Sequence, residues 1–248
     1  MSHKPQADRP KSSFDLGRYV VIDKPPEWTS FDVVNKFRYV LSKALGVKRI
    51  KVGHAGTLDP LATGVVVVCT GRFTKTIDEV QKGLKHYVTT IKLGETTPSF
   101  DLESEVDATF PYEHITREMT EETLRKFEGE IDQVPPLFSA VNINGTRAYK
   151  LARKGEEAEL PAKKVFIREI RLTSFEPPML TLEVTCGKGT YIRSLARDLG
   201  RDLGSGAHLT ALRRTSVGPF TLDGAIKPEE IEDFIKGELE KEGYKREQ

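Results

Sequence analysis

The stretch Gly53–Gly64 has the sequence GHAGTLDPLATG, and a run of four valines, Val65–Val68, follows it directly. The valine run predicts a short strand that is buried on both faces, because apolar residues at every position leave no face for solvent. The glycines ahead of it let the backbone turn sharply. Asp59 is the one carboxylate in the stretch, and Pro60 restricts its backbone and removes one amide donor beside it.

Asp59 taken alone has two interpretations. A carboxylate held rigidly at the mouth of a buried strand can serve as a nucleophile or a general base. The tripeptide Leu-Asp-Pro is by itself more often a turn, in which the aspartate side chain bonds to nearby backbone. The function therefore has to be assigned from the whole twelve-residue block.

That block resembles the catalytic-aspartate motif of the TruB family, the tRNA pseudouridine synthases that isomerise uridine 55 in the T-arm. The resemblance implies that Asp59 is the nucleophile and that His54 helps the RNA loop to open. It also implies that the target base is flipped out of its stack and rejoined to the ribose through C5. Such a reaction has no redox change and no net hydrolysis, so neither a cofactor nor a metal is expected.

The preceding segment resembles the family's opening motif. A strand is expected over residues 18–23, followed by Lys24-Pro25 and by a helix that Thr29 or Ser30 caps and that ends near Gly46. In the family this Lys-Pro element packs under the catalytic loop. A structural role is therefore expected for Lys24 and Pro25.

A further strand, expected over residues 84–94, contains Tyr87. In isolation Tyr87 is typical of a half-buried strand tyrosine. The resemblance places it at the active-site tyrosine that stacks on the flipped uracil. In the loop that follows, Pro98 and Ser104 replace an aspartate and a glycine of the family pattern, whereas Asp101 is retained. No role is carried over to the replaced positions.

Residues 186–193, CGKGTYIR, form the second informative stretch. Thr190 is expected to cap a helix with one apolar face, and three arginines repeat every four residues along another face: Arg193, Arg197 and Arg201. The last two have aspartate neighbours and are expected to form a solvated ion-pair face. The resemblance implies that Arg193 pairs with the catalytic carboxylate and that Tyr191 lines the uracil pocket.

The stretch Gly206–Arg214 matches the last core motif of the family. Leu212 would contact the base, while Arg213 and Arg214 would lie near the RNA or fix the loop. His208 is expected to be structural. The resemblance thus runs in order from about residue 18 to residue 220.

Residues 134–160 resemble the family's thumb, an insertion that orders around the T-loop. Arg147, Lys150 and Arg153 are expected to reach RNA phosphates there, although a plain solvated face has about the same weight without the resemblance. Before the thumb, Thr120 is expected to cap an acidic helix that ends ahead of Gly129.

Charge is segregated along the chain although the net charge is only +1. Residues 1–77 hold 13 Lys and Arg against 6 Asp and Glu, and residues 133–219 hold 14 against 8. The two other segments are acidic, with 6 against 14 in residues 78–132 and 5 against 9 in residues 220–248. If the basic segments share a face, they form an RNA-binding surface that the total conceals.

Composition restricts the class of protein further. Cys69 and Cys186 form no metal-binding pair and are typical thiols of a reducing compartment. No signal peptide or membrane anchor is expected, so the predicted location is the cytoplasm. The predicted organisation is a disordered tail over residues 1–15, a catalytic domain over 16–222 and a helical tail over 223–248, with too few residues after Arg214 for a PUA-like domain.

The predicted fold is therefore α+β, of the pseudouridine synthase kind, with a mixed and mostly antiparallel sheet flanked by helices. tRNA is the expected partner of a monomer that needs no protein partner. Two alternatives are a guide-RNA-dependent, dyskerin-like synthase and a tRNA folding chaperone that needs no catalysis. The absence of room for the C-terminal domain disfavours the first, and Asp59 within an intact motif disfavours the second.

Overall fold

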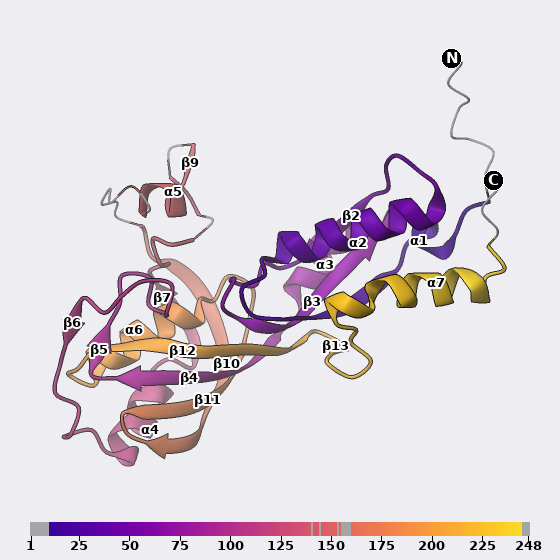
Figure 1. The fold of residues 1–248 in the computed structure, drawn as a ribbon. Coiled ribbons are helices and arrows are strands. Elements are labelled where there is room, and N and C mark those ends of the chain that lie inside the picture. The colour runs from indigo at the N-terminus through magenta and orange to yellow at the C-terminus, as the bar shows by residue number, and fades with distance from the viewer. Residues whose placement is uncertain (1–9, 140, 144, 153, 155–159, 245–248) are drawn as a thin grey trace. The chain divides into compact units, whose positions relative to one another are not determined.

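The computed structural model describes residues 10–139, 141–143, 145–152, 154 and 160–244. Contacts divide the chain into two compact units, one of residues 1–83 with 214–248 and the other of residues 84–213. Both units combine strands with helices (Figure 1). The catalytic-domain boundaries expected at residues 16 and 222 were set by sequence motifs, whereas the two units are defined by contacts. Those boundaries therefore stay a prediction.

The first unit is built on β3 (Thr63–Thr70), which contains the valine run. Its antiparallel neighbours are β1 (Tyr19–Lys24) and β2 (Val52–Ala55), with Tyr19 opposite Cys69 and His54 opposite Val68. On the side opposite β1, the same side as β2, lies β12 (Ala207–Val217), whose last residues belong to this unit and pair with β13 (Phe220–Thr221). All four valines of β3 are 0% exposed, which confirms the predicted doubly buried strand.

The helices of the first unit include α2 (Ser30–Leu45) and α7 (Ile231–Lys241), which lie side by side (Figure 1). Thr29 and Asp32 cap α2 reciprocally, and Gly46 ends it in the left-handed conformation, as predicted. The remaining helical segments are short: α1 (Ser13–Leu16), η1 (Gly71–Thr76), α3 (Ile77–Lys82) and η2 (Pro228–Glu230).

The prediction of a disordered start through residue 15 is wrong for residues 12–15. Ser12 and Asp15 form a capping box on α1, and Phe14 is 0% exposed. Its ring meets those of Phe37 and Phe234 edge-on, with centroids 6.1 and 6.5 Å apart. A single aromatic residue in a polar stretch gave no local signal, because its partners lie on α2 and α7. Residues 1–9 lie outside the described part of the chain.

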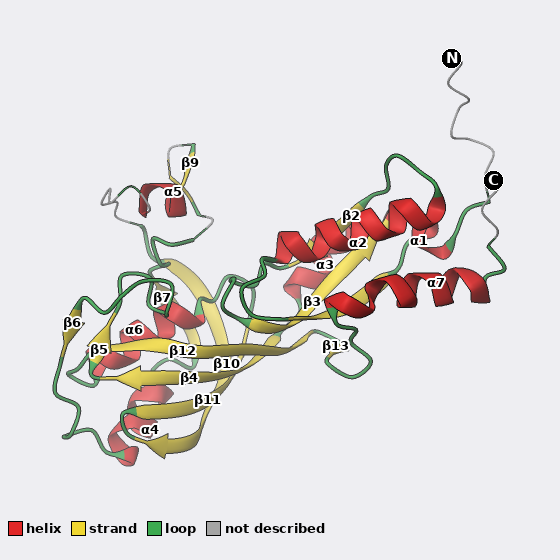
Figure 2. Ribbon diagram, in the orientation of Figure 1, coloured by secondary structure: helices red, strands yellow, loops and turns green. Residues whose placement is uncertain are grey.

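The second unit contains a sheet in the order β12, β4 (Lys85–Leu93), β11 (Met179–Cys186), β10 (Lys163–Glu176) and β7 (Gly129–Gln133), drawn in yellow in Figure 2. The pairs β4–β11, β11–β10 and β10–β7 are antiparallel. Two small two-stranded pairs complete the strands of this unit: β5 (Glu95–Thr96) with β6 (Ala108–Thr109), and β8 (Asn142–Ile143) with β9 (Thr146–Arg147).

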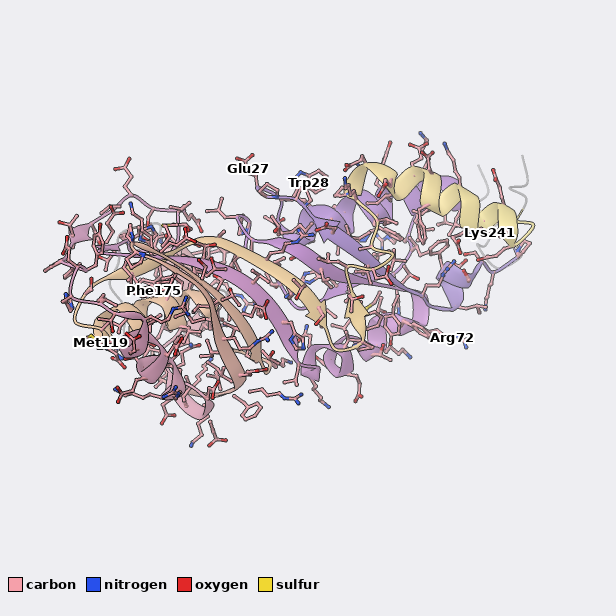
Figure 3. The ribbon with its side chains drawn as sticks, turned by 90° about the horizontal axis from the view of Figure 1, so that it is seen from below. Glu27, Trp28, Arg72, Met119, Phe175 and Lys241 are labelled. Carbon is pink, nitrogen blue, oxygen red and sulfur yellow. The ribbon has the colours of Figure 1, made fainter. Side chains whose placement is uncertain are left out.

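The described part of the second unit has three helices: α4 (Arg117–Arg125), α5 (Ala148–Ala152) and α6 (Ile192–Asp202). The apolar residues of α6, including Leu195 and Leu199, enter one core with those of β4, β10 and β11. Helix α4 packs against β10, where the Arg117 guanidinium lies 5.7 Å from the centre of the Phe175 ring (Figure 3 labels Phe175 and, on α4, Met119).

Both helix caps predicted for this unit are wrong. Helix α4 begins earlier than expected, because Thr116 accepts from the Met119 amide, while Thr120 lies inside the helix and its hydroxyl donates to the Thr116 carbonyl. At α6 the cap position is Tyr191, and Thr190 makes no hydrogen bond with its buried hydroxyl in the described part of the chain. Gln133 of β7 holds the Tyr191 backbone instead, through 2.8 and 3.1 Å bonds to its amide and carbonyl.

Candidate functional site

Asp59 lies in the loop between β2 and β3, in the first unit. The Ala62 amide donates to the Asp59 carbonyl at 3.1 Å, which closes a turn that contains Pro60. Ser30, the first residue of α2, fixes the other side: its hydroxyl accepts from the Leu58 amide at 2.9 Å and donates to the Leu58 carbonyl at 3.2 Å. The residues flanking Asp59 are thus anchored, and Asp59 itself is half-buried.

Lys24 supports the same loop from β1. Its ammonium group is completely buried and donates to the carbonyls of Pro25 at 2.9 Å, Trp28 at 2.6 Å and Pro60 at 2.9 Å. Burial lowers the pKa of Lys24 to about 8, and the negative charge of Asp59 acts against this shift. The Pro60 bond confirms that the Lys-Pro element packs against the loop that bears Asp59.

Arg214 holds the loop from β12. Its guanidinium donates from Nε to the Val65 carbonyl at 2.8 Å, from Nη2 to the Gly56 carbonyl at 3.1 Å and from Nη1 to the Thr57 carbonyl at 3.4 Å. The residue is 1% exposed. Of the two roles left open by the sequence for Arg214, a phosphate contact or a support of the loop, this placement favours the support.

Gly64 explains why the approach of Arg214 is possible. Its φ is +103°, and a Cβ atom there would lie 2.1 Å from the Arg214 carbonyl oxygen. Any side chain would both strain the backbone and displace β12 from the end of the loop.

His54 lies on β2, five residues before Asp59, and is half-buried. Burial lowers the pKa of His54, the Gly56 carbonyl opposes this, and the positive charge of Arg214 lowers it further. The ring is therefore neutral at pH 7, and its Nδ1 has no hydrogen-bond partner among the described residues. A neutral ring suits contact with a nucleobase better than contact with a phosphate.

The second unit holds the other predicted site residues. Tyr87 on β4 and Leu212 on β12 are half-buried and pack against the same apolar core. Their strands are neighbours, and the Thr89 hydroxyl donates across to the Ala211 carbonyl at 2.8 Å. Tyr191 stands at the start of α6, where Gln133 fixes its backbone.

Arg193, in the first turn of α6, is 3% exposed. It donates to the Ser99 carbonyl at 3.1 Å and to the Phe138 carbonyl at 2.9 Å, and its Nε lies 3.6 Å from Oδ2 of Asp101. Asp101 was missed as a partner, although it was the acid retained in an otherwise altered motif. Pairing of Arg193 with Asp59 stays a prediction.

The first residue of the thumb, Val134, is hydrogen-bonded to side chains of α6. The Val134 carbonyl accepts from Ser194 at 2.8 Å and from Arg197 at 3.1 Å. Further along, Arg147 and Lys150 are exposed, while Arg153 lies outside the described residues. Arg197 and Arg201 both bond to Asp198, at 2.9 and 3.2 Å, which confirms the predicted ion pairs of α6. The predicted solvation holds for Arg201, whose side chain is 67% exposed, but not for Asp198, which is buried.

Residues 42–192 match the TruB family pseudouridylate synthase (N terminal domain), and residues 193–246 match the tRNA pseudouridylate synthase B C-terminal domain. The chain belongs to the TruB family. The segment matched as C-terminal domain comprises here α6, β12, β13 and most of the tail with α7.

Relatives of this TruB chain are similar along most of their length. A tRNA pseudouridine synthase B of Parabacteroides distasonis is 60% identical over 223 residues, which are 90% of this chain and 95% of that protein. That of Flavobacterium johnsoniae is 51% identical over 211 residues, 85% of this chain and 92% of its own.

Solved structures resemble the chain as well. A chain in the crystal structure of a Cbf5-Nop10-Gar1 complex has a TM-score of 0.69 and 27% identity, over 94% of this chain. One in the structure of an H/ACA RNP bound to a substrate RNA containing 2'-deoxyuridine has a TM-score of 0.65 and 25% identity, also over 94%. This chain spans 58% and 57% of the length of those two chains. The predicted pseudouridine synthase fold is confirmed.

Two further properties concern the described residues only. None of their helices is both long and apolar enough to cross a membrane. They include no group of three or more His, Cys, Asp or Glu side chains placed to hold a metal ion.

Proposed function

We propose that this TruB chain isomerises uridine to pseudouridine at position 55 in the T-arm of tRNA. Relatives 55–60% identical to it are named tRNA pseudouridine synthase B, which favours tRNA over a guide-RNA-dependent substrate. One structural observation carries the proposal. The loop that bears Asp59 is held by Ser30, Lys24 and Arg214 through backbone bonds, which leave the carboxylate as its chemically active group.

The proposed roles follow the family motifs. Asp59 is the nucleophile, Tyr87 stacks on the flipped uracil, and Arg193 supplies positive charge for catalysis. Further contacts to the base come from His54, Tyr191 and Leu212. Phosphates are bound by Arg147 and Lys150, the exposed cations of the thumb, and by Arg153 and the half-buried Arg213.

The chemistry balances without any co-reactant. The bond from N1 of uracil to the ribose breaks and a bond from C5 to the same ribose carbon forms. One proton leaves C5 and one joins N1, so nothing is oxidised and no water is consumed. Flipping the base costs a few kcal/mol, which stacking on aromatic side chains and phosphate contacts offset.

Pseudouridine mapping of an unmodified tRNA transcript tests the proposal. Incubation with the protein and no additive should produce pseudouridine at position 55. Asp59→Asn should abolish the product while RNA affinity stays within a few-fold, because the substitution keeps the shape and removes only the anion. Turnover near the wild-type rate in the variant would overturn the assignment of Asp59.

We also propose that the enzyme acts as a cytoplasmic monomer with tRNA as its one required partner and no cofactor. The support is the chemistry above, in which base, ribose and carboxylate complete the reaction. Full activity after dialysis against a chelator, at a protein concentration where sedimentation finds monomer, is the expected outcome. Activity that returned only with added metal or a second protein would contradict it.

A further inference from the structure

A concave surface of about 600 Å³ lies on the first unit, between α2 and the segment that connects α2 to β2. We call it the basic groove. Its lining consists of eight residues: Asn35, Arg38, Tyr39, Ser42, Lys48, Arg49, Ile50 and Lys51. Its four cations belong to the basic segment of residues 1–77, but none of the residues expected individually to bind RNA lines it.

The charge of the basic groove is unbalanced. Four of its lining side chains are cationic and none is a carboxylate. A neighbouring hollow of about 320 Å³ shares Tyr39 but faces α7, and there Lys43 and Lys236 stand against Glu232 and Glu240. Lys236 and Glu232 form an ion pair at 2.8 Å. The same helix thus has a neutralised hollow on one side and an uncompensated positive one on the other, where anions concentrate.

Arg38 is oriented before any ligand arrives. Its Nη1 donates to the Asn35 side-chain oxygen and its Nη2 to the Val52 carbonyl, both at 2.9 Å. A guanidinium fixed in this way loses little rotamer freedom when it meets a phosphate. Tyr39, beside it, is 67% exposed. An open aromatic ring next to cations is the arrangement that binds nucleic acid by stacking and phosphate contact.

The basic groove is close to the catalytic loop within the same unit. Lys51 lies directly before β2 and three residues ahead of His54, which is about 10 Å in extended chain. Arg38 follows Ser30 by eight residues along α2, about 12 Å at the rise of a helix, and Ser30 is bonded to Leu58. An RNA whose uridine reaches Asp59 therefore has further nucleotides within reach of the groove.

We propose that the basic groove binds backbone phosphates of the substrate RNA, with one base stacked on Tyr39. This rests on the proposed action on tRNA and adds a binding site outside the catalytic loop and the thumb. Lys48, Arg49 and Lys51 contact phosphates, and Arg38 fixes their register.

Two matched triple variants test the proposal. Lys48→Ala/Arg49→Ala/Lys51→Ala removes three positive charges from the groove. Lys43→Ala/Lys236→Ala/Lys241→Ala removes three from the side of α2 and α7 (Figure 3 labels Lys241 on α7). Affinity for an unmodified tRNA transcript and for its isolated T-arm hairpin is measured by filter binding over a range of salt concentrations.

The groove variant should bind tRNA at least ten-fold more weakly, and its salt slope should fall by about 2, since each lost phosphate contact removes roughly 0.7–0.9. The control variant, which lacks Lys43, Lys236 and Lys241, should bind tRNA with an affinity within two-fold of that of the wild type. An equal loss with the hairpin would place the bound phosphates in the T-arm, and a loss with tRNA alone would place them outside it. A groove variant that binds both RNAs as the control does would overturn the proposal.

Tyr39 tests the stacked base separately. Tyr39→Phe should bind tRNA within two-fold of the wild type and Tyr39→Ala at least five-fold more weakly, because only the ring is needed for stacking. Equal affinities of the two variants would overturn the stacking. These experiments measure RNA affinity and not isomerisation. If the groove variants weaken binding but the wild type isomerises no uridine, the result would count against the proposed function and not against the groove.

Discussion

At the scale of single residues, two buried cations of the first unit act on the backbone of one loop. Arg214 reaches carbonyls on both sides of Asp59, those of Gly56 and Val65, whereas Lys24 reaches that of Pro60. Carbonyls accept hydrogen bonds from a cation strongly, and such bonds are worth more than neutral ones. The position of Asp59 is therefore set by side chains distant in sequence.

Replacement of Arg214 should slow the reaction more than it weakens RNA binding. Arg214→Lys keeps the charge, but one ammonium nitrogen cannot take the positions of the three guanidinium nitrogens that donate to Val65, Gly56 and Thr57. We expect the single-turnover rate at saturating tRNA to fall at least ten-fold in both Arg214→Lys and Arg214→Met, with affinity within about three-fold of the wild type. Thermal melts monitor folding, since unsatisfied carbonyls cost about 1–3 kcal/mol each.

A different result would assign Arg214 to RNA binding. In that case both variants would react at the wild-type rate once saturated, and Arg214→Lys would recover most of the affinity that Arg214→Met had lost.

The lowered pKa of Lys24, about 8, predicts a pH dependence of stability. Between pH 8 and 10.5 the unfolded chain holds the Lys24 proton more strongly than the folded chain does. This group therefore makes the free energy of unfolding rise with pH across that window. Relative to Lys24→Met, which lacks the group, the wild type should gain about 1–3 kcal/mol from pH 8 to pH 10.5 in urea denaturation.

Lys82→Met is the matched control, because the Lys82 side chain is 71% exposed. It is compared with the wild type over the same pH range. A Lys24→Met variant that behaves as Lys82→Met does would contradict the lowered pKa.

At the scale of elements, short segments depend on the helices against which they pack. Helix α1 has only four residues and could not persist alone in water. The helix is stable in the folded protein because Phe14 packs against Phe37 of α2 and Phe234 of α7. Arg18 adds a 2.6 Å ion pair to Glu238 of α7. The first described helix is thereby joined to α7.

Phe14→Ala should lower the free energy of unfolding by about 3 kcal/mol, the usual cost of removing a fully buried phenylalanine. Leu16→Ala, in the same helix but 48% exposed, should cost less than about 1 kcal/mol. Urea denaturation of both variants measures the difference. Equal costs would show that α1 contributes nothing through its aromatic contact.

At the scale of the whole molecule, charge distribution matters more than the net charge of +1. The groove cations and the thumb cations both come from the two basic segments of the chain, residues 1–77 and 133–219. Acidic residues are concentrated elsewhere in the sequence. The total therefore understates the positive potential available to RNA.

RNA affinity should accordingly depend steeply on salt. We expect log affinity for tRNA to fall linearly with log salt concentration, with a slope of about −3 or steeper, since each neutralised phosphate contributes roughly 0.7–0.9. Filter binding at salt concentrations from about 50 to 300 mM, a range that includes physiological ionic strength, measures this slope. A slope near zero would contradict recognition through phosphates.

The sequence by itself determined the family and the main elements of the fold. The valine run, the Thr29 and Gly46 caps and the strand around Tyr87 depend on neighbours along the chain, so local patterns were sufficient for them. The Asp59 block was long enough to indicate the chemistry. Local patterns failed where two candidates competed, as for Thr116 and Thr120 at the start of α4.

Only the tertiary structure decided what the polar residues of the site contact. Arg214 could have faced solvent or the loop, and the choice depends on Gly64 allowing close approach. Asp101 pairs with Arg193 although the two residues are 92 positions apart in the sequence (193 minus 101). The basic groove is distinct because carboxylates of α7 neutralise one side of α2 and not the other. Burial and charge balance arise from residues brought together in space, and no run of neighbouring residues contains that information.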